Sequence, residues 1–330
     1  MHIPENYLSP STCGVMAAAM VPVWIHSVRT VNKDLPAKKI PLLGVGASFS
    51  FLSMMFNIPL PGGTTGHAVG GTLIAILLGP EAACLSVTIA LAIQALLFGD
   101  GGILSFGANC FNMAFVLPYA GCYIYRLLAG KKSGLKRKLV SAALGSYIGI
   151  NAAALCAAVE FGIQPYLFHD AAGHALYCPY PLSVSIPAMM IGHLTLSGLA
   201  EVVFTIGILA FLYKTSPEFM ENKDEKIKTG PLAALIAMLI ALVPLGLLAD
   251  GTAWGEWGAE EIQEATGISY VPQKIARGWS MQTLFPDYSM NGLPESMAYI
   301  LSAVIGTALA VILFRLAASF HKDRKKYNNA

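Results

Sequence analysis

His2 is the residue whose position in this sequence most directly suggests chemistry. The amine of Met1, the peptide nitrogen of His2 and the His2 imidazole are adjacent in the chain, so they can chelate one ion at little entropic cost. Three coplanar nitrogen donors suit square-planar or tetragonal Ni(II) or Cu(II), and Co(II) uses similar donors. Because the amine must lose a proton to bind, we expect metal binding to weaken as the pH falls. The alternative is that His2 is an incidental polar residue near the terminus.

This chelate requires Met1 to remain the first residue. The opening MHIPENYLSP has no basic segment and no apolar stretch before Pro10, so we expect no cleaved signal peptide. The mature protein should therefore begin with the chelating amine.

His67 is the natural candidate for a fourth donor. It follows the turn 62–66 at the expected outer end of a membrane span, and neutral imidazole is the commonest metal ligand in proteins. Thr64 and Thr65, in the same turn, are expected to line the site. A helix-end histidine satisfied by backbone groups is the alternative, but two histidines on the outer side favour a metal site.

Four polar residues surround a second expected outer loop, 98–109. Amides near a ligand histidine can orient its ring through the other nitrogen. With equal weight, they can instead hydrogen-bond the exposed loop backbone. The four are Gln94, Asp100, Asn109 and Asn112.

His193 and Glu201 are ionisable residues inside an expected span. Such residues are rare in membranes and usually functional, so both are weaker candidates for the site. At about 100° per helical residue they lie about 80° apart, and their spacing alone does not pair them. An interhelical hydrogen bond is the alternative interpretation for each.

The composition identifies the kind of protein that positions these residues. Of 330 residues, 55% are hydrophobic and 12% charged, whereas a soluble domain has about 25% charged residues. A net charge of +2 without a basic face argues against nucleic-acid binding. The six cysteines contain no C-x-x-C pair, so no thiolate cluster is expected. The fold class is therefore an all-α polytopic membrane protein.

Nine apolar segments qualify as spans, since about 20 residues cross a bilayer. The third and fourth are separated only by Gly79-Pro80-Glu81, and form either two tightly joined spans or a broken pair. The nine segments are 12–28, 40–57, 67–79, 81–98, 106–127, 139–161, 187–213, 231–249 and 297–318.

The basic residues predict the orientation of these spans. With nine spans and an outer N-terminus, all of the 21 Lys and Arg residues except Lys274 and Arg277 lie in or beside inner loops. Cytoplasmic loops carry the excess of such residues, so the C-terminus should be cytoplasmic. The N-terminus and the loops 59–67 and 98–109 then meet on the outer side.

A charged stretch at 214–230 divides the chain. We expect a main unit, 1–213, with seven spans, then a cytoplasmic linker. A two-span unit, 231–330, follows, with an outer loop at 250–296.

Several stretches resemble a known family. MHIPENYLSP, GHAVGGTLIAILLGPEAA, IQALLFGDGGILSFGANCFNMAF and MIGHLTLSGLAEVVFT are similar to the substrate-specific component of cobalt/nickel energy-coupling-factor transporters, the CbiM/NikM family. The resemblance covers about residues 1–213. It implies a seven-helix bundle whose N-terminus tucks into the outer face, with an ion bound by Met1, His2 and His67.

The resemblance also implies partners: a transmembrane coupling protein and two cytoplasmic ABC ATPases. One departure is the segment Glu5-Asn6-Tyr7, where the family usually has acidic-Gly-aromatic; the missing glycine puts the turn behind the chelate in question. Residues 231–330 resemble the family's small two-span accessory component, fused here, with Asp250-Gly251 and the acidic, aromatic outer loop as the only echoes.

We therefore expect a plasma-membrane subunit for uptake of Co(II) or Ni(II), and the sequence does not decide between these metals. It has no phosphate-binding G-x-x-x-x-G-K-[ST] loop, so partners must hydrolyse ATP. The alternatives are a secondary transporter or channel, a vitamin-specific subunit of the same transporter type, or a membrane enzyme. For an enzyme, Glu160 and Glu201 are the only carboxylate candidates within the spans.

Overall fold

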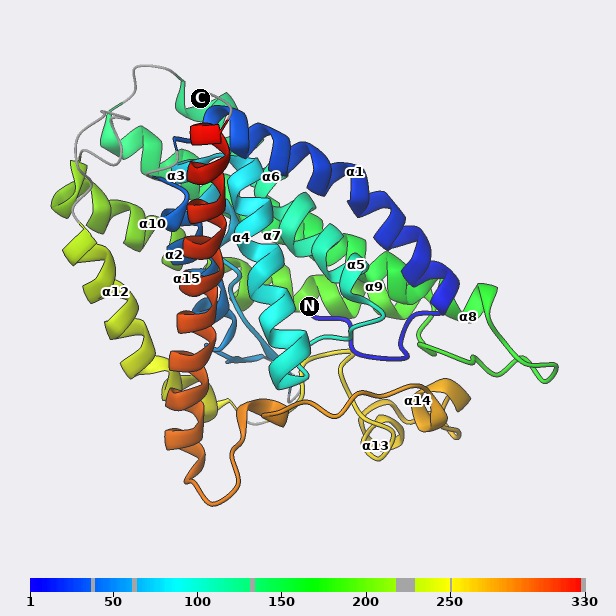
Figure 1. Ribbon diagram of the computed structural model, residues 1–330. Coiled ribbons are helices and arrows are strands. Elements are labelled where there is room, and N and C mark those ends of the chain that lie inside the picture. Colours follow the sequence, from blue (N-terminus) through cyan, green and yellow to red (C-terminus); the bar gives the residue numbers. More distant parts are fainter. Residues whose placement is uncertain (37–38, 61–63, 131–133, 218–228, 250, 328–330) are drawn as a thin grey trace.

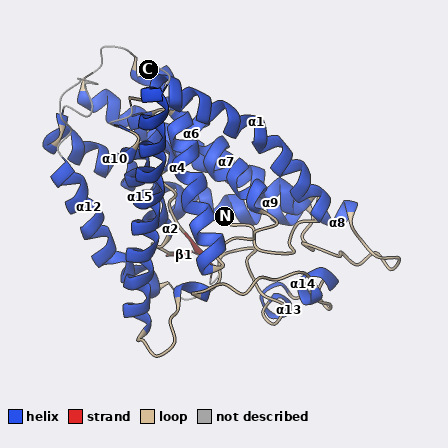
Figure 2. Cartoon of the chain, viewed as in Figure 1, coloured by secondary structure: helices blue, strands red, loops and turns tan. Residues whose placement is uncertain are grey.

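The computed structural model is a bundle of helices with a short β-hairpin (Figures 1 and 2). It describes residues 1–36, 39–60, 64–130, 134–217, 229–249 and 251–327. Most of the predicted linker 214–230, and residues 61–63 of the first glycine-rich loop, lie outside the described residues.

The helices of the predicted main unit begin and end as follows: α1 (Pro10–Asp34), α2 (Pro41–Met54), α3 (Gly71–Leu78), α4 (Pro80–Ile93), α5 (Phe106–Asn109), α6 (Leu117–Ala129), α7 (Leu135–Gly162), α8 (Gln164–Leu167), α9 (Leu182–Gly192) and α10 (Gly198–Thr215). Three π-helical turns extend or join them: η2 (Gln94–Phe98), η3 (Cys110–Val116) and η4 (His193–Ser197). The hairpin pairs β1 (Ile58–Leu60) with β2 (Thr64–Gly66).

The remaining elements are α12 (Thr229–Leu242), the 3-10 turn η5 (Val243–Leu248), α13 (Ile262–Thr266), α14 (Gln273–Arg277), the 3-10 turn η6 (Pro286–Tyr288) and α15 (Glu295–Tyr327). The short helices α13 and α14 lie at the opposite end of the molecule from the C-terminus (Figure 1).

Within the described residues, six helical segments are long and apolar enough to cross a membrane: 10–34, 80–98, 135–167, 182–215, 229–248 and 295–319. They coincide with six of the nine expected spans. The other three expected spans are also helical but shorter or divided. The expected span 40–57 contains α2, with 14 residues, and 67–79 contains α3, with 8. The expected span 106–127 is divided among α5, η3 and α6. The structure thus shows a mostly helical protein with six candidate spans, and the seven-plus-two count stays a prediction.

The segment 67–98 forms two helices. Gly79, at φ +96°, ends α3, and Pro80 begins α4. A Cβ atom on Gly46 would lie 3.2 Å from both Ile74 and Ser86, so the two helices fold back beside each other. At 1.5 Å per residue α3 is about 12 Å long, too short to cross a bilayer core alone.

The C-terminal helix α15 packs along α2. A Cβ atom on Gly306 would overlap the ring of Phe51, and one on Gly44 would lie 3.0 Å from the backbone of Val311. Small residues allow membrane helices to approach this closely. The last long helix is therefore an integral part of the bundle.

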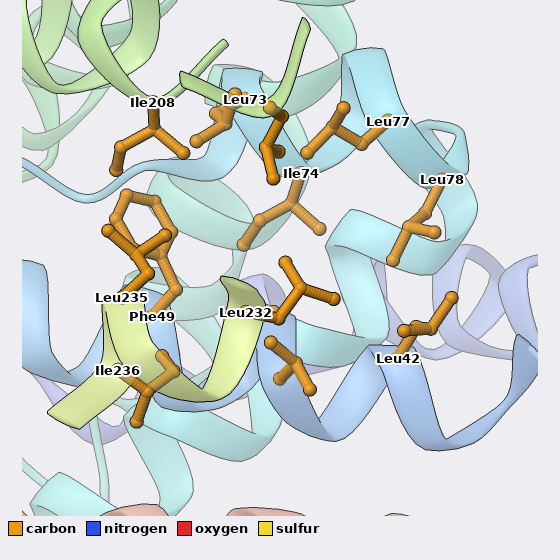
Figure 3. Close-up of a pocket in the computed structure, with 13 residues that line it drawn as sticks. Leu42, Phe49, Leu73, Ile74, Leu77, Leu78, Ile208, Leu232, Leu235 and Ile236 are labelled. Atoms are coloured by element: carbon orange, nitrogen blue, oxygen red, sulfur yellow. The ribbon is translucent and has the colours of Figure 1, made fainter. Parts of the chain in front are cut away.

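A cavity of about 50 Å³ lies between α12 and the helices α2, α3 and α10 (Figure 3). Aliphatic side chains and Phe49 line it, together with Gly46. Since none of the lining side chains carries a nitrogen or oxygen donor, this cavity cannot coordinate a metal ion.

The loop between η5 and α15 covers the loops of the main unit. The Phe285 N–H donates to the Leu97 carbonyl at 2.9 Å, and the Lys274 N–H donates to the Leu176 carbonyl at 3.0 Å. These bonds hold the loop over the end of the bundle where the N-terminus lies.

Candidate metal site

The start of the chain is buried and fixed in place. Met1 and His2 are 3% and 2% exposed. The Ile3 N–H donates to Asn109 Oδ1 at 2.8 Å, and Asn109 Nδ2 donates to the Ile3 carbonyl at 3.0 Å. The Gly102 N–H also donates to that carbonyl, at 2.8 Å. The predicted site residue Asn109 thus positions the N-terminal segment by pairing with its backbone.

Asn6 forms the turn behind His2 at the position where the family usually has glycine. Asn6 has φ +65°, the left-handed region that glycine favours and that asparagine tolerates best among other residues. The Glu5 carboxylate accepts N–H bonds from Ile103 and Leu104, while burial raises the pKa of Glu5. Asn6 therefore preserves the turn that glycine would make.

The two histidines meet at a distance suited to one ion. His2 Nδ1 lies 3.2 Å from His67 Nε2. Two nitrogen ligands at right angles, each about 2 Å from a metal, are about 3 Å apart. His67 Nδ1 lies 3.2 Å from the Ala68 carbonyl. That contact suits a protonated Nδ1, so that Nε2 has the lone pair that can bind a metal ion.

His67 lies before α3, outside the six candidate spans. Burial, and next the charge of the N-terminal amine, hold the pKa of His67 well below its usual value. The ring is therefore neutral and ready to act as a ligand.

The Met1 amine faces a cavity and a carboxylate. It lies 3.2 Å from Glu256 Oε1 in the C-terminal loop. The cavity has a volume of about 240 Å³, and its lining includes Met1, Thr64, Thr65, His193 and Trp257. Both threonines thus line the same cavity as Met1.

Asp100 contacts the same histidine nitrogen that would bind metal. Its Oδ1 lies 3.2 Å from His2 Nδ1. Its Oδ2 accepts bonds from Gln94 Nε2, at 3.0 Å, and from the Tyr288 hydroxyl, at 2.5 Å. His2 Nε2 is buried without a hydrogen-bond partner among the described residues. Asp100 thus contacts Nδ1 of His2 and not the other ring nitrogen, and Tyr288 was not identified from the sequence.

Asn112 lies away from the two histidines in its contacts. Its Nδ2 donates to Glu160 Oε2 at 2.8 Å. This amide therefore bonds a carboxylate inside the bundle, and no hydrogen bond among the described residues joins it to His2 or His67.

Glu201 supports the segment that carries His67. Its carboxylate accepts the Val69 N–H at 2.7 Å and the Gly70 N–H at 2.9 Å, at the N-terminal end of α3. A negative charge there is favourable, because the first N–H groups of a helix lack partners within it. The sequence identified Glu201 as unusual, and its hydrogen-bond partners here are backbone N–H groups.

His193 is the remaining candidate. Its Nδ1 donates to the Met189 carbonyl at 2.8 Å, and its ring lines the same cavity as Met1. His193 and Glu201 have separate partners, so they do not pair with each other.

Among the described residues, no group of three or more His, Cys, Asp or Glu side chains could hold a metal ion. A planar chelate at Met1 and His2 does not need one, because two of its donors are main-chain nitrogens.

Buried ionisable groups at one end of an apolar helical bundle are the kind of groups that mark substrate and ion pathways in membrane proteins. The family model described as the cobalt uptake substrate-specific transmembrane region, CbiM, matches residues 2–219, and the PDGLE domain matches residues 229–323. The chain therefore belongs to the CbiM family and carries a fused PDGLE domain. The resemblance expected from the sequence, including the fused accessory segment, is confirmed.

The relatives of this chain are metal transport proteins. The probable fused nickel transport protein LarMN of Lactiplantibacillus plantarum is 48% identical over 321 residues, 96% of this chain and 97% of its own. The fused nickel transport protein NikMN of Rhodobacter capsulatus is 46% identical over 341 residues, with the same two shares. A crystal structure of a truncated transition metal transporter is 56% identical, covers 65% of this chain and 99% of its own, and has a TM-score of 0.61. This chain is accordingly a membrane protein of nickel or cobalt transport.

Proposed function

We propose that this protein binds Ni(II) from the outer side of the membrane and delivers it for import, with Co(II) as the second candidate. The donors would be the Met1 amine, the peptide nitrogen and Nδ1 of His2, and Nε2 of His67. The observation that carries this proposal is the 3.2 Å separation of His2 Nδ1 and His67 Nε2 beside the buried N-terminus.

Two arguments favour nickel over cobalt. A planar set of four nitrogen donors matches the square-planar preference of Ni(II). Three fused relatives that each cover at least 95% of the chain are all named for nickel transport.

The chain would act as the substrate-binding subunit of an ATP-driven energy-coupling-factor importer. A transmembrane coupling protein and two cytoplasmic ABC ATPases would supply the energy, since the sequence has no phosphate-binding loop of its own. Reorientation of the bundle would then release the ion inside. The family membership supports this arrangement.

The same proposal includes the organisation of the chain in the plasma membrane. Residues 1–213 would form the seven-span metal-binding unit, 214–230 a cytoplasmic linker, and 231–330 the two-span accessory unit. The N-terminus would face outward and the C-terminus the cytoplasm, because the basic residues then lie in inner loops.

The test is metal binding by the purified full chain, without a histidine tag. Equilibrium dialysis with Ni(II), Co(II) and Zn(II) compares the unsubstituted protein with His67→Ala and with His174→Ala, a control in the exposed loop that follows α8. We expect one equivalent of Ni(II) in the unsubstituted protein and the control, and loss of binding in His67→Ala. Equal binding in all three proteins would refute His67 as a ligand.

A further inference from the structure

We propose that Tyr288, in the PDGLE domain, is a positioning residue that acts through Asp100 and helps the metal site select Ni(II) over Zn(II). The inference rests on the proposed function, since it names a further residue that controls the same site. It also gives the fused domain a direct part in metal recognition.

A continuous chain of contacts joins Tyr288 to the chelate. The Tyr288 hydroxyl donates to Asp100 Oδ2 at 2.5 Å. Gln94 Nε2 lies 3.0 Å from the same oxygen and 2.9 Å from the Tyr288 hydroxyl. Asp100 Oδ1 lies 3.2 Å from His2 Nδ1. One carboxylate oxygen is thus held from behind, while the other faces the ligand nitrogen.

The surroundings of Tyr288 hold its ring in one position. The side chain is 8% exposed, stacks on Phe98 with centroids 4.7 Å apart, and meets Tyr299 edge-on at 5.4 Å. The Ser302 hydroxyl donates to the Tyr288 carbonyl at 3.1 Å. Burial also raises the pKa of Tyr288 well above its usual value, so the hydroxyl keeps the proton that it donates.

The backbone at Tyr288 is unusual in a way that fits a functional role. Asp287 and Tyr288 have φ values of +51° and +59°, a region that residues other than glycine rarely adopt. Such conformations persist only where the surrounding structure fixes them, and they cluster at functional sites. Here the left-handed pair lies at the point where the domain contacts Asp100.

The position of Asp100 bears on the choice of metal. Zn(II) is usually four-coordinate and tetrahedral and readily takes a carboxylate ligand, whereas Ni(II) suits a planar nitrogen set. A carboxylate free to move toward the ion would add an oxygen donor and favour zinc. Two hydrogen bonds to Oδ2 fix the orientation of Asp100, whose Oδ1 already lies 3.2 Å from His2 Nδ1. They therefore limit how far the carboxylate can turn toward an ion, so that the nitrogen donors determine the geometry.

The test substitutes Tyr288→Phe in the full chain and measures the dissociation constants of Ni(II) and Zn(II). Tyr299→Phe is the matched control, because it removes a buried hydroxyl from the same aromatic cluster. The Tyr299 hydroxyl donates to the Met55 carbonyl and not to Asp100. We expect the Ni(II)-over-Zn(II) selectivity to fall about tenfold in Tyr288→Phe, the scale of one lost hydrogen bond to a charged group. The visible absorption band of square-planar Ni(II) should also weaken in Tyr288→Phe. The control should change neither the selectivity nor this band.

The outcomes separate this inference from the proposed function. If the unsubstituted protein binds Ni(II) but Tyr288→Phe weakens both metals by the same factor, or neither, Tyr288 has no part in selectivity and the inference is overturned. The selectivity change must also disappear in an Asp100→Ala background, because Tyr288 acts through that carboxylate. A failure of the unsubstituted protein to bind Ni(II) would overturn the proposed function as well.

Discussion

Asn109 offers a direct test of how the N-terminal segment is held in place. The substitution Asn109→Ala removes the acceptor for the Ile3 N–H and one donor to the Ile3 carbonyl. The carbonyl keeps its bonds from Gly102 and Ser105. The Ile3 N–H is left buried without a partner, one residue from the proposed ligand His2.

The structure sets the size of the expected effect. A buried donor left unsatisfied costs about 1–3 kcal/mol, which corresponds to roughly 5- to 150-fold in an equilibrium constant. The penalty falls on the docked segment, so Ni(II) affinity should decrease by up to that factor. The stability of the rest of the bundle should change much less.

Isothermal titration with Ni(II) measures this loss, and Ser105→Ala calibrates it. Ser105 is one of several donors to the Ile3 carbonyl, so its loss should weaken binding by less than about fivefold. Equal affinity in Asn109→Ala and the unsubstituted protein would refute the role assigned to Asn109.

Three further results are expected. Ni(II) affinity should rise with pH, by up to about two log units per pH unit, because the Met1 amine and the peptide nitrogen of His2 each release a proton on binding. His67 is already neutral and releases none. Titrations at several pH values test this, and an affinity independent of pH would contradict it. Glu201→Ala should lower the unfolding temperature in detergent, since two N–H groups before α3 lose their acceptor at about 1–3 kcal/mol each, and Glu201→Gln should lower it less. Gly79→Ala should destabilise the α3–α4 turn by about 1 kcal/mol or more and lower the unfolding temperature, because alanine is strained at a positive φ. Gly207→Ala is the control, since no atom lies near the Cβ position of Gly207, and it should not lower the unfolding temperature.

The proposed chelate could be predicted from the sequence because its donors are neighbours in the chain. No tertiary information is needed to bring Met1 and His2 together, and the residues around His67 match a family motif. The membrane class follows from composition alone. These predictions depend on local chemistry, which a sequence states directly.

The contacts that hold the site were beyond the sequence because they join distant segments. Tyr288 lies 188 residues from Asp100, and its left-handed backbone has no signal in the residue types around it. Glu201 was recognised as unusual, but a carboxylate that accepts backbone N–H groups does not reveal its partners by spacing. The bond between Asn112 and Glu160 likewise depends on how η3 packs against α7.

The length of α3 shows the same limit for the fold. Residues 67–79 form one apolar run, which predicts a helix from His67 onward. The helix instead begins at Gly71, because Gly70 has φ +76° and Glu201 takes the N–H groups before it. Residues 67–70 therefore lie outside the helix, and this segment places His67 beside His2.

The most direct test of the account is a single glycine added before Met1. The added residue moves the free amine away from His2 and leaves every side chain unchanged, while the same glycine at the C-terminus serves as the control. Ni(II) content and affinity are then measured for both proteins. We expect the N-terminally extended protein to lose Ni(II) binding and the control to keep it. Equal binding by the two would contradict the claim that the Met1 amine is a ligand.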